Sequence, residues 1–435
     1  MTTPIRALTR MKPVPSRWPV AWRSGVCAAI VVGAGAALGE STLGLVGSLG
    51  AFAPLYAGRG PVRREVLVVA IAAVGLALAV VVGSSFSAVP WLAVVLTAIW
   101  TVVASTVVQV VNAPPPGMLM FVLTCSVGVG LPSGHQLQFA GAVLAAGAVG
   151  VVLTTLRPWR ATEGWAPPVM RLKLDWVLRS PIPRVAWRTG LGVGLAGLAS
   201  LELGLFRPSW AMIAAVAVLA QGTYAAVTIE RALLRGVGAI AGCVVASGIL
   251  WLHPRAYAAA LLLGVLMCVI ELTAPRNVAL SMVFITPLSL TLVDAAAAPL
   301  PVLPTTGALL ADTAIGCVAA VLVGQLVTTR WVDRQCFHAV NGVLKTASAT
   351  LDDPSRVVEL THARGRMALV RQRMMGERRG VRPAAAAWQE LLAEADEVGQ
   401  QVLTIVDGHP ENAAATAEEV QRLRERARAQ WPAAP

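Results

Sequence analysis

The sequence predicts an all-α membrane protein with two parallel six-helix transmembrane repeats, about twelve spans in all, and a C-terminal cytoplasmic helical domain. Hydrophobic residues form 56% of the 435-residue chain and charged residues only 13%, whereas about a quarter of an ordinary soluble domain is charged. Long apolar runs recur throughout residues 1–330. The motif AWRSG at 21–25 returns as AWRTG at 186–190, an offset of 165 residues.

Twelve apolar stretches in series account for the predicted spans. Several are shorter than the ~20 residues that a spanning helix prefers, but flanking Trp and Arg side chains extend them into the headgroup region. One short stretch alone fits a buried helix of a soluble protein, whereas twelve in series with almost no charge do not. The stretches are 25–38, 43–57, 66–82, 89–111, 117–131, 137–156, 190–205, 210–227, 233–252, 257–272, 278–293 and 306–328.

The charges indicate how the chain is oriented. Of the 35 Lys and Arg residues, 14 lie in 331–435, together with 14 of the 23 Asp and Glu residues. The net charge of +12 therefore belongs to residues 1–330, where Arg occurs in short clusters between apolar runs, a pattern that argues against nucleic-acid binding. Every second loop carries these clusters, and the other loops hold only Arg207 and Arg255. The positive-inside rule then places both termini in the cytoplasm of a multi-pass plasma-membrane protein.

The repeated motif predicts how the chain divides into domains. At the offset of 165, Trp22-Arg23 falls on Trp187-Arg188 and Gly39 on Gly204. Six stretches in each half return the chain to its starting side, so the two repeats run parallel. The predicted parts are a cytoplasmic segment 1–20, a first repeat 21–158, a cytoplasmic linker 159–186, a second repeat 187–330 and a cytoplasmic helical domain 331–435.

Two parts outside the repeats have helical patterns. Residues 165–179 interleave Trp and Leu with Arg and Lys, which favours a helix lying in the membrane interface over a plain linker. In the tail, Asp353-Pro354 predicts a helix start, with further helices over 384–406 and 411–430 and with 331–350 continuing the last span. Regulation, contact within a homo-oligomer and a passive cap remain open as roles of this domain.

Four segments of the second half carry a family resemblance. They are FRPSWAMIAAVAVLAQG (206–222), ERALLRGVGAIAG (230–242), VFITPLSL (283–290) and ADTAIG (311–316). They resemble the fusaric acid resistance protein-like (FUSC) family, which is related to aromatic acid exporters and to plant aluminium-activated malate channels. The positions that match its pattern are Trp210, Arg235 with Gly238 and Gly242, and Asp312-Thr313 with Gly316, whereas Ala239 stands where the family often has Thr.

The resemblance covers 187–330, and it reaches 21–158 only through the repeat. It implies six-span units followed by a cytoplasmic helical domain. It also implies export or conduction of organic anions.

The sequence predicts no enzyme, metal site or cofactor. It holds no Gly-x4-Gly-Lys-Ser/Thr loop, no converging Ser, His and Asp, and no metal-ligand spacing among its six Cys. Three carboxylates, Glu202, Glu271 and Asp312, lie near the ends of apolar stretches. We expect them to be structural partners of nearby Arg residues rather than catalysts, although a carboxylate inside a span is also a functional candidate.

The solute pathway is predicted where both halves have short stretches interrupted by Pro and Gly, at 117–131 and 278–293. Pro287 breaks the second of these. Once a short gap is placed in the alignment of the two halves, Thr124 and Thr286 stand in equivalent positions beside the two breaks. Ser126 and Ser289 add hydroxyl groups. The other interpretation, kinked packing helices whose Thr residues bond to their own backbone, stays open.

Further candidates lie on neighbouring stretches. Arg231 and Arg235 share one helix face, where they could draw an anion from the cytoplasm or be neutralised within a structural network. Trp210 and Gln221 mark a second route along the eighth stretch.

The leading functional hypothesis is a secondary exporter of aromatic or other organic acids, with a small organic anion and the lipid bilayer as its partners. The alternatives are a passive organic-anion channel of the same fold and a non-transporting membrane scaffold that acts through its cytoplasmic tail.

The topology is testable with fusions. A reporter that is active only in the periplasm should be active when fused after Ser133 or His253 and inactive when fused after Arg330, because the first two positions fall in the sparsely charged loops. The reverse pattern would contradict both the orientation and the parallel repeat.

Overall fold

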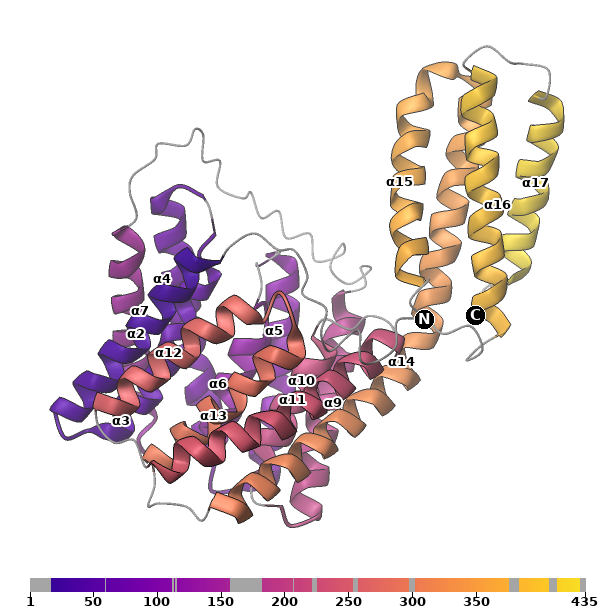
Figure 1. Cartoon of the computed structure of the whole chain (residues 1–435). Helices are drawn as coiled ribbons and strands as arrows, with labels where there is room; N and C mark the ends of the chain where they lie inside the picture. Colours follow the sequence, from indigo (N-terminus) through magenta and orange to yellow (C-terminus); the bar gives the residue numbers. More distant parts are fainter. Residues whose placement is uncertain are drawn as a thin grey trace. The chain divides into compact units, whose positions relative to one another are not determined.

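All regular structure in the described part of the chain is helical (Figure 1). The computed structural model describes residues 17–58, 60–111, 113, 116–156, 182–205, 207–220, 225–252, 257–296, 302–374, 383–406 and 413–430. The chain divides into two compact units. The first, called the membrane unit below, comprises Met1–Gln221 and Glu230–Val323, and the second comprises Gly222–Ile229 and Gly324–Pro435. The interfacial helix predicted at 165–179 and the candidate Gln221 lie outside the described residues.

The first half of the membrane unit contains six helical segments. Proline stands at the start of several helices of the chain, where a missing N–H costs nothing, as Pro90 does in α5. Pro54 lies inside the tight 3₁₀ helix that continues α3, and Gly117 takes a positive φ of 63° just before the short α6. The segments are α2 (Trp18–Ala37), α3 (Ser41–Gly47) with η1 (Ser48–Tyr56), α4 (Val62–Ser85), α5 (Pro90–Val110), α6 (Leu119–Val129) and α7 (Gln136–Thr155).

The second half contains six helices as well, and its last helix continues beyond the unit. α14 runs unbroken past residue 323 to Asp352, so 331–350 extends the last apolar stretch. The helices are α9 (Ile182–Glu202), α10 (Pro208–Leu219), α11 (Ala225–Trp251), α12 (Tyr257–Thr273), α13 (Val278–Ala296) and α14 (Val302–Asp352).

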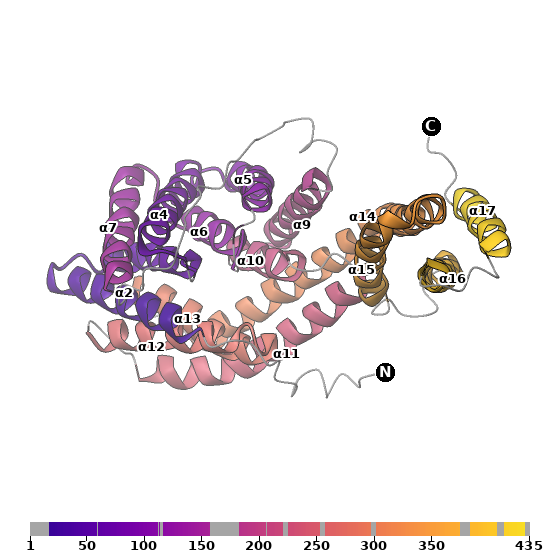
Figure 2. The ribbon, with the colours of Figure 1, turned by 90° about the horizontal axis from the view of Figure 1, so that it is seen from above.

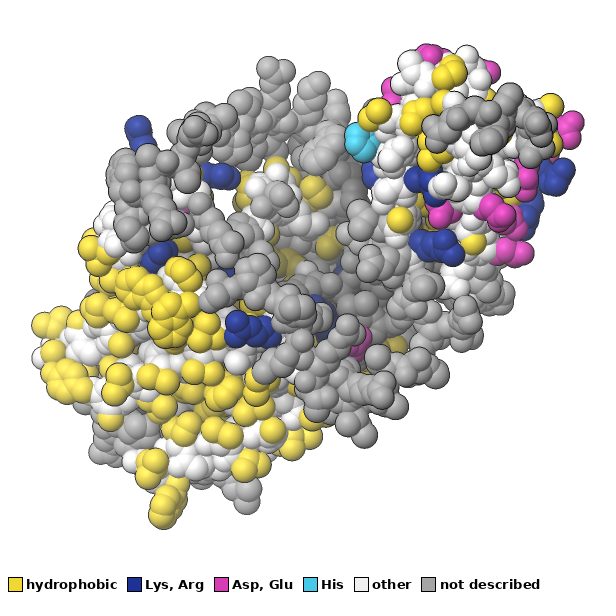
Figure 3. Space-filling model, turned by 45° about the horizontal axis from the view of Figure 1, so that its top comes forward, with side chains coloured by type: hydrophobic (Ala, Val, Ile, Leu, Met, Phe, Trp, Pro, Cys, Tyr) yellow, Lys and Arg dark blue, Asp and Glu magenta, His cyan; other side chains and the backbone are white. Residues whose placement is uncertain are grey.

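Six helical segments of the described chain are long and apolar enough to cross a membrane. Their outward faces support this, because large apolar side chains such as Leu67, Ile71, Val74 and Leu78 of α4 are exposed at helical spacing. Hydrophobic side chains cover much of the visible face of this unit (Figure 3). The six are Trp18–Ala37, Val62–Ser85, Pro90–Val110, Gln136–Thr155, Thr228–Ile249 and Pro304–Leu326, and the shorter apolar helices are Ser41–Tyr56, Leu119–Val129, Pro208–Leu219, Tyr257–Thr273 and Val278–Thr291.

The helices of the two halves correspond at the offset found in the sequence. Shifted by 165, the bounds of α2 fall within one residue of those of α9, and those of α5 fall within two residues of those of α12. Gly39 and Gly204, one offset apart, both take a positive φ, 75° and 65°, just after the first helix of their half. A duplicated six-helix unit would produce this correspondence.

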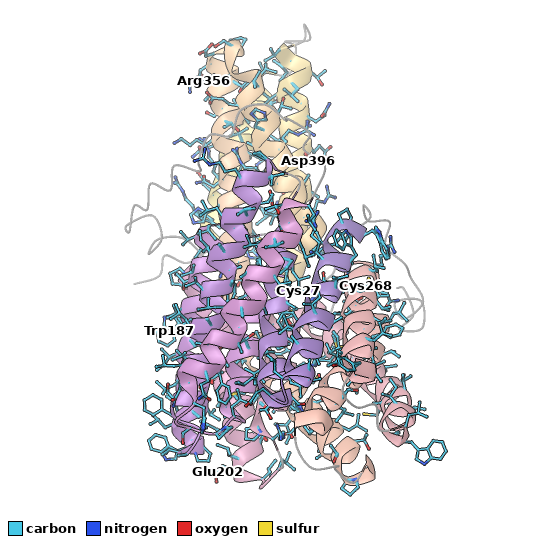
Figure 4. The ribbon with its side chains drawn as sticks, turned by 90° about the vertical axis from the view of Figure 1, so that its left-hand side faces the viewer. Cys27, Trp187, Glu202, Cys268, Arg356 and Asp396 are labelled. Atoms are coloured by element: carbon cyan, nitrogen blue, oxygen red, sulfur yellow. The ribbon has the colours of Figure 1, made fainter. Side chains whose placement is uncertain are left out.

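The two halves exchange helix contacts across their boundary. The first helix of each half packs against the fourth helix of the other, so that α2 lies beside α12 and α9 beside α5 (Figure 2). Cys27 and Cys268 mark the first of these pairs in Figure 4. Glycine allows the close approach, because a Cβ on Gly25 would lie 2.5 Å from the Gly264 carbonyl oxygen and a Cβ on Gly190 would lie 2.9 Å from that of Ala98.

The C-terminal bundle is built from the end of α14 and from α15 (Val357–Met374), α16 (Pro383–Val406) and α17 (Ala413–Gln430). Trp388 is fully buried in its core. Asp353 begins the short turn before α15, and the amide and hydroxyl of Ser355 both donate to its carboxylate, which holds the pKa of Asp353 below its usual range. Charged side chains gather on the surface of this bundle (Figure 3), in pairs such as Arg364 with Asp396 at 3.0 Å. Exposed pairs of this kind contribute little stability.

A substitution at Gly83 tests the packing of α4 against α6. A Cβ at this position would overlap the carbonyl oxygen of Cys125 and lie 3.0 Å from the Cα of Gly128. We expect Gly83→Ala to lower the free energy of unfolding by roughly 1–3 kcal/mol, the usual cost of overpacking. The measurement is the Tm of the purified protein in detergent, which should fall. Gly141→Ala is the matched control, because a Cβ on that helical glycine would meet nothing within 4 Å. It should be neutral or slightly stabilising, and equal effects of the two substitutions would contradict the packing described here.

Candidate functional site

An elongated cavity of about 290 Å³ lies between the two halves of the membrane unit. The first half lines it through α2, α3, η1 and α6, and the second half through α10, α11, α12 and α13. Its walls are mainly apolar, with Phe52 and Leu123 on one side and Ile213, Met267 and Ile285 on the other. Both helices that the sequence singled out for Pro and Gly interruptions, α6 and α13, therefore contribute to the wall.

The cavity extends along the helix axes. At one end it is lined by Thr42 near the start of α3, by Pro132 beyond α6 and by Arg207 just before α10. At the other end it is lined by Leu55 near the end of η1 and by Glu271 near the end of α12. These residues stand at opposite ends of their helices, so the lining reaches most of the way through the unit.

Arg235 of α11 brings a buried positive charge to this cavity. Its side chain is only 8% exposed. Nη1 donates to the thioether sulfur of Met282 at 3.1 Å, and Nε has no hydrogen-bond partner among the described residues. A thioether is a weak acceptor, so the guanidinium keeps most of its capacity for an anion.

Glu271 is the acidic residue that lines the cavity in the described chain, and a cation balances it. Arg17 Nη1 lies 3.6 Å from Glu271 Oε2. Arg17 Nη2 also donates to the carbonyl of Leu55 at 3.3 Å, and the hydroxyl of Tyr56 donates to the carbonyl of Gly117 at 2.5 Å. Together these contacts join α2, η1 and α12 at this end of the cavity.

Asp312 lies at a different contact, where α14 meets α9. It is 0% exposed. The hydroxyl of Ser200 donates to Oδ1 at 2.5 Å, while Oδ2 has no hydrogen-bond partner among the described residues. Helix α14 begins at Val302, so Asp312 stands almost three turns inside the helix rather than at its end. The sequence predicts an Arg side chain as its partner, whereas its contacts are with the hydroxyl of Ser200 and the backbone of Arg207.

The hydroxyl candidates of α6 and α13 differ in their surroundings. Thr124 and Ser126 are 0% exposed, do not line the cavity, and have no partner for their hydroxyls in the described chain. Thr286 donates to the carbonyl of Met282 at 3.0 Å and lines a pocket of about 30 Å³ beside Trp210 and Arg235. Ser289, which donates to the carbonyl of Ile285 at 3.0 Å, lines both spaces. Pro287 lies inside α13 without ending it.

The remaining candidates separate into lining and peripheral residues. Trp210 lines the cavity at the start of α10. Arg231 is partly exposed one turn before Arg235 and does not line the cavity. Glu202 is exposed at the end of α9, and Trp187 points outward from the same helix (Figure 4).

Sequence reasoning did not select several residues that the structure brings together. In the sequence, Arg207 stands out only as one of two basic residues in the sparsely charged loops, and that rarity is the available signal. Ser24 and Ser209 also line the cavity. Neither they nor the apolar wall residues carry a signal, because similar residues recur in every apolar stretch. Ser200 and Asp312 are 112 positions apart, and nothing in the sequence paired them.

Comparisons with known proteins agree with the motifs of the second half. The model of the family described as "Fusaric acid resistance protein-like" matches residues 195–323. Trp210, Arg235 and Asp312 all lie in this range.

One curated relative is the uncharacterized membrane protein YvaC of Bacillus subtilis (strain 168). It is 28% identical over 176 residues, which are 40% of this chain and 27% of the relative. The match therefore spans about a quarter of the length of that protein. No solved structure matches the chain. Residues 195–323 are thus similar to the fusaric acid resistance protein-like family, and the chain is a multi-pass helical membrane protein.

Proposed function

We propose that this protein is a secondary exporter of aromatic or other planar organic acids across the plasma membrane, without enzymatic activity. The observation that supports this most directly is the apolar cavity between the two halves, with the buried guanidinium of Arg235 in its wall. The family match supports a membrane transporter in general terms.

The chemistry of the cavity suits an acid with a flat apolar body. Its walls of Leu, Ile, Met and Phe offer an aromatic ring an environment that is more favourable than water. A carboxylate that entered with the ring would lose its hydration, and this costs several kcal/mol unless a cation replaces the water. Arg235 supplies a planar fork of donors that matches a carboxylate. A volume of about 290 Å³ lies at the lower end of the range for ligand pockets, which favours a small acid over a bulky one.

The charges around the cavity favour a monoanion. Glu271 is paired with Arg17, so its charge is already balanced. Arg235 donates to the thioether of Met282, which carries no charge. One added negative charge would therefore balance Arg235, whereas a second carboxylate would have to reach Arg207 at the end of the cavity or be buried against apolar walls.

The proposed topology has twelve spans with both termini in the cytoplasm. Each of the twelve apolar stretches overlaps a helix of the structure. In this orientation Arg235 lies in the cytoplasmic half of α11, where a substrate leaving the cell would be bound, and Arg207 lies at the outer end of the cavity.

The exporter is distinguished from a passive channel and from a scaffold by transport in inverted vesicles that contain the full chain. A panel of labelled aromatic and aliphatic carboxylic acids is supplied with and without a proton gradient, and protein-free vesicles correct for diffusion of the neutral acids. Accumulation that requires the gradient supports the exporter. Equal flux with and without the gradient supports the channel, and absence of flux for every acid supports the scaffold.

Substitutions of Arg235 test in this assay whether its guanidinium binds the anion. We expect Arg235→Gln to raise the KM for a monocarboxylate roughly 10–100-fold, because a charge-assisted hydrogen bond contributes about 1.5–3 kcal/mol. The KM of Arg235→Lys should lie between those of Arg235→Gln and the wild type, since Lys keeps the charge but loses the planar fork.

The matched control is Arg276→Gln, which removes a charge from the loop between α12 and α13 without touching the cavity lining. It should leave KM unchanged. A folded Arg235→Gln protein with wild-type KM would exclude Arg235 as the anion-binding group.

A further inference from the structure

We infer that Asp312 is the proton-binding group that couples export to the proton gradient, with its carboxyl alternating between a charged and a protonated state while the organic anion binds at Arg235. This inference rests on the proposed function and goes beyond it by naming the driving ion and its site. The juxtaposition that carries it is the buried Asp312–Ser200 pair between α14 and α9.

Asp312 differs from the other buried carboxylates of the membrane unit. Glu65 accepts hydrogen bonds from the backbone amides of Gly58 and Gly60, and Glu271 is paired with Arg17. Among the described side chains, Asp312 is the buried carboxyl that has neither a cation nor donors for both oxygens, because Oδ2 is orphaned. A buried acid inside an apolar helix is costly in its charged form, and a bound proton removes that charge.

Ser200 is the right kind of partner for a group that changes its protonation state. A hydroxyl is both a donor and an acceptor. In the charged state the hydroxyl donates to Oδ1, as the contact of 2.5 Å allows. In the protonated state the carboxyl O–H donates to the serine oxygen, and the serine proton turns to a helix carbonyl. An Arg or Lys partner would instead hold the group permanently charged.

The surroundings place this pair between the cavity and one end of the unit. The backbone of Arg207 interacts with the Asp312 carboxylate, and the side chain of Arg207 lines the end of the cavity. The next residue, Thr313, lines the small pocket that it shares with Trp210 and Arg235. The charged groups on the neighbouring elements are Arg207 before α10, the exposed Glu202 at the end of α9, and Arg235 on α11. A change of charge on Asp312 therefore acts on the helices that hold the proposed anion site.

The first half has no equivalent of this pair. At the offset of 165, Ser200 and Asp312 fall on Gly35 and Gly147. A Cβ on Gly35 would lie 2.5 Å from the Cα of Gly44, and a Cβ on Gly147 would overlap that of Ala73. These positions pack helices together in the first half, whereas the second half places an ionisable group there. Among the described residues, the proposed proton site therefore lies in the second half. A cycle takes one proton from outside onto the Asp312 carboxylate and releases it to the cytoplasm, while one anion moves outward.

The first test uses proteoliposomes that hold the full chain and a radiolabelled aromatic carboxylate accumulated by the wild type, benzoate being the simplest to try. Asp312→Asn cannot bind a proton but keeps an oxygen for Ser200. We expect this variant to lose gradient-driven accumulation and to keep the exchange of labelled for unlabelled acid across the membrane, which needs no net proton movement. Glu40→Gln, at an exposed carboxylate before α3, should keep both activities.

Gradient-driven accumulation by Asp312→Asn at the wild-type level would overturn the inference. If the wild type neither accumulates nor exchanges any acid, the proposed function itself fails, so the two failures are distinguishable.

A second measurement on the wild-type protein keeps the test independent of the variant. A hydrophobic carbodiimide adds to protonated carboxyl groups in apolar surroundings, and the modified peptide is identified by mass. We expect labelling of Asp312 that increases as the pH falls and decreases when the transported acid is bound. Absence of labelling at Asp312, or labelling that is independent of pH, would overturn the assignment.

Discussion

The packing of the first helix of each half against the fourth helix of the other determines where the cavity lies. Glycines bring the backbones of α2 and α12 close together, and glycine again brings α9 close to α5. Because these four helices pack against one another in two pairs, the second and fifth elements of the two halves face inward. α3 contacts α13, and α10 contacts α6. The wall of the cavity is then built from both halves, and neither half encloses it alone.

The two halves resemble each other in the positions of their helices but differ in their ionisable side chains. The helix bounds of the two halves correspond at the offset of 165 for α2 with α9 and for α5 with α12, and Gly39 and Gly204 share the left-handed conformation just after the first helix of their half. The ionisable side chains do not follow the repeat. Arg235, Glu271 and Asp312 fall on Ala70, Thr106 and Gly147 of the first half. We interpret the first half as a packing partner that completes the cavity, and the second half as the part that carries the chemistry. The family match at 195–323 covers the same part.

Much of the fold was accessible from the sequence, because apolar runs and the repeated motif depend on local composition. Each apolar stretch overlaps a helix, although the eighth stretch, 210–227, covers both the end of α10 and the start of α11. The Pro and Gly interruptions predicted α6 and α13, which line the cavity. The sequence did not predict which face of each of these helices lines the cavity. Because α6 is apolar on all sides, the position of Thr124 did not indicate which side of the helix faces the cavity. Leu123 and Val127, rather than Thr124, line the cavity. The partners of Asp312 and Glu271 were also beyond reach, because each contact joins residues far apart in the chain.

The central claim is that a single aromatic carboxylate binds in this cavity with its acid group at Arg235. The most direct test is a crystal structure of the full chain with a brominated aromatic monocarboxylate, in which anomalous scattering locates the bromine. The account predicts one bromine position between α6 and α13, with the carboxylate within hydrogen-bonding distance of Arg235. A bromine found only on the lipid-facing surface or in the C-terminal bundle, with the cavity empty, would contradict it.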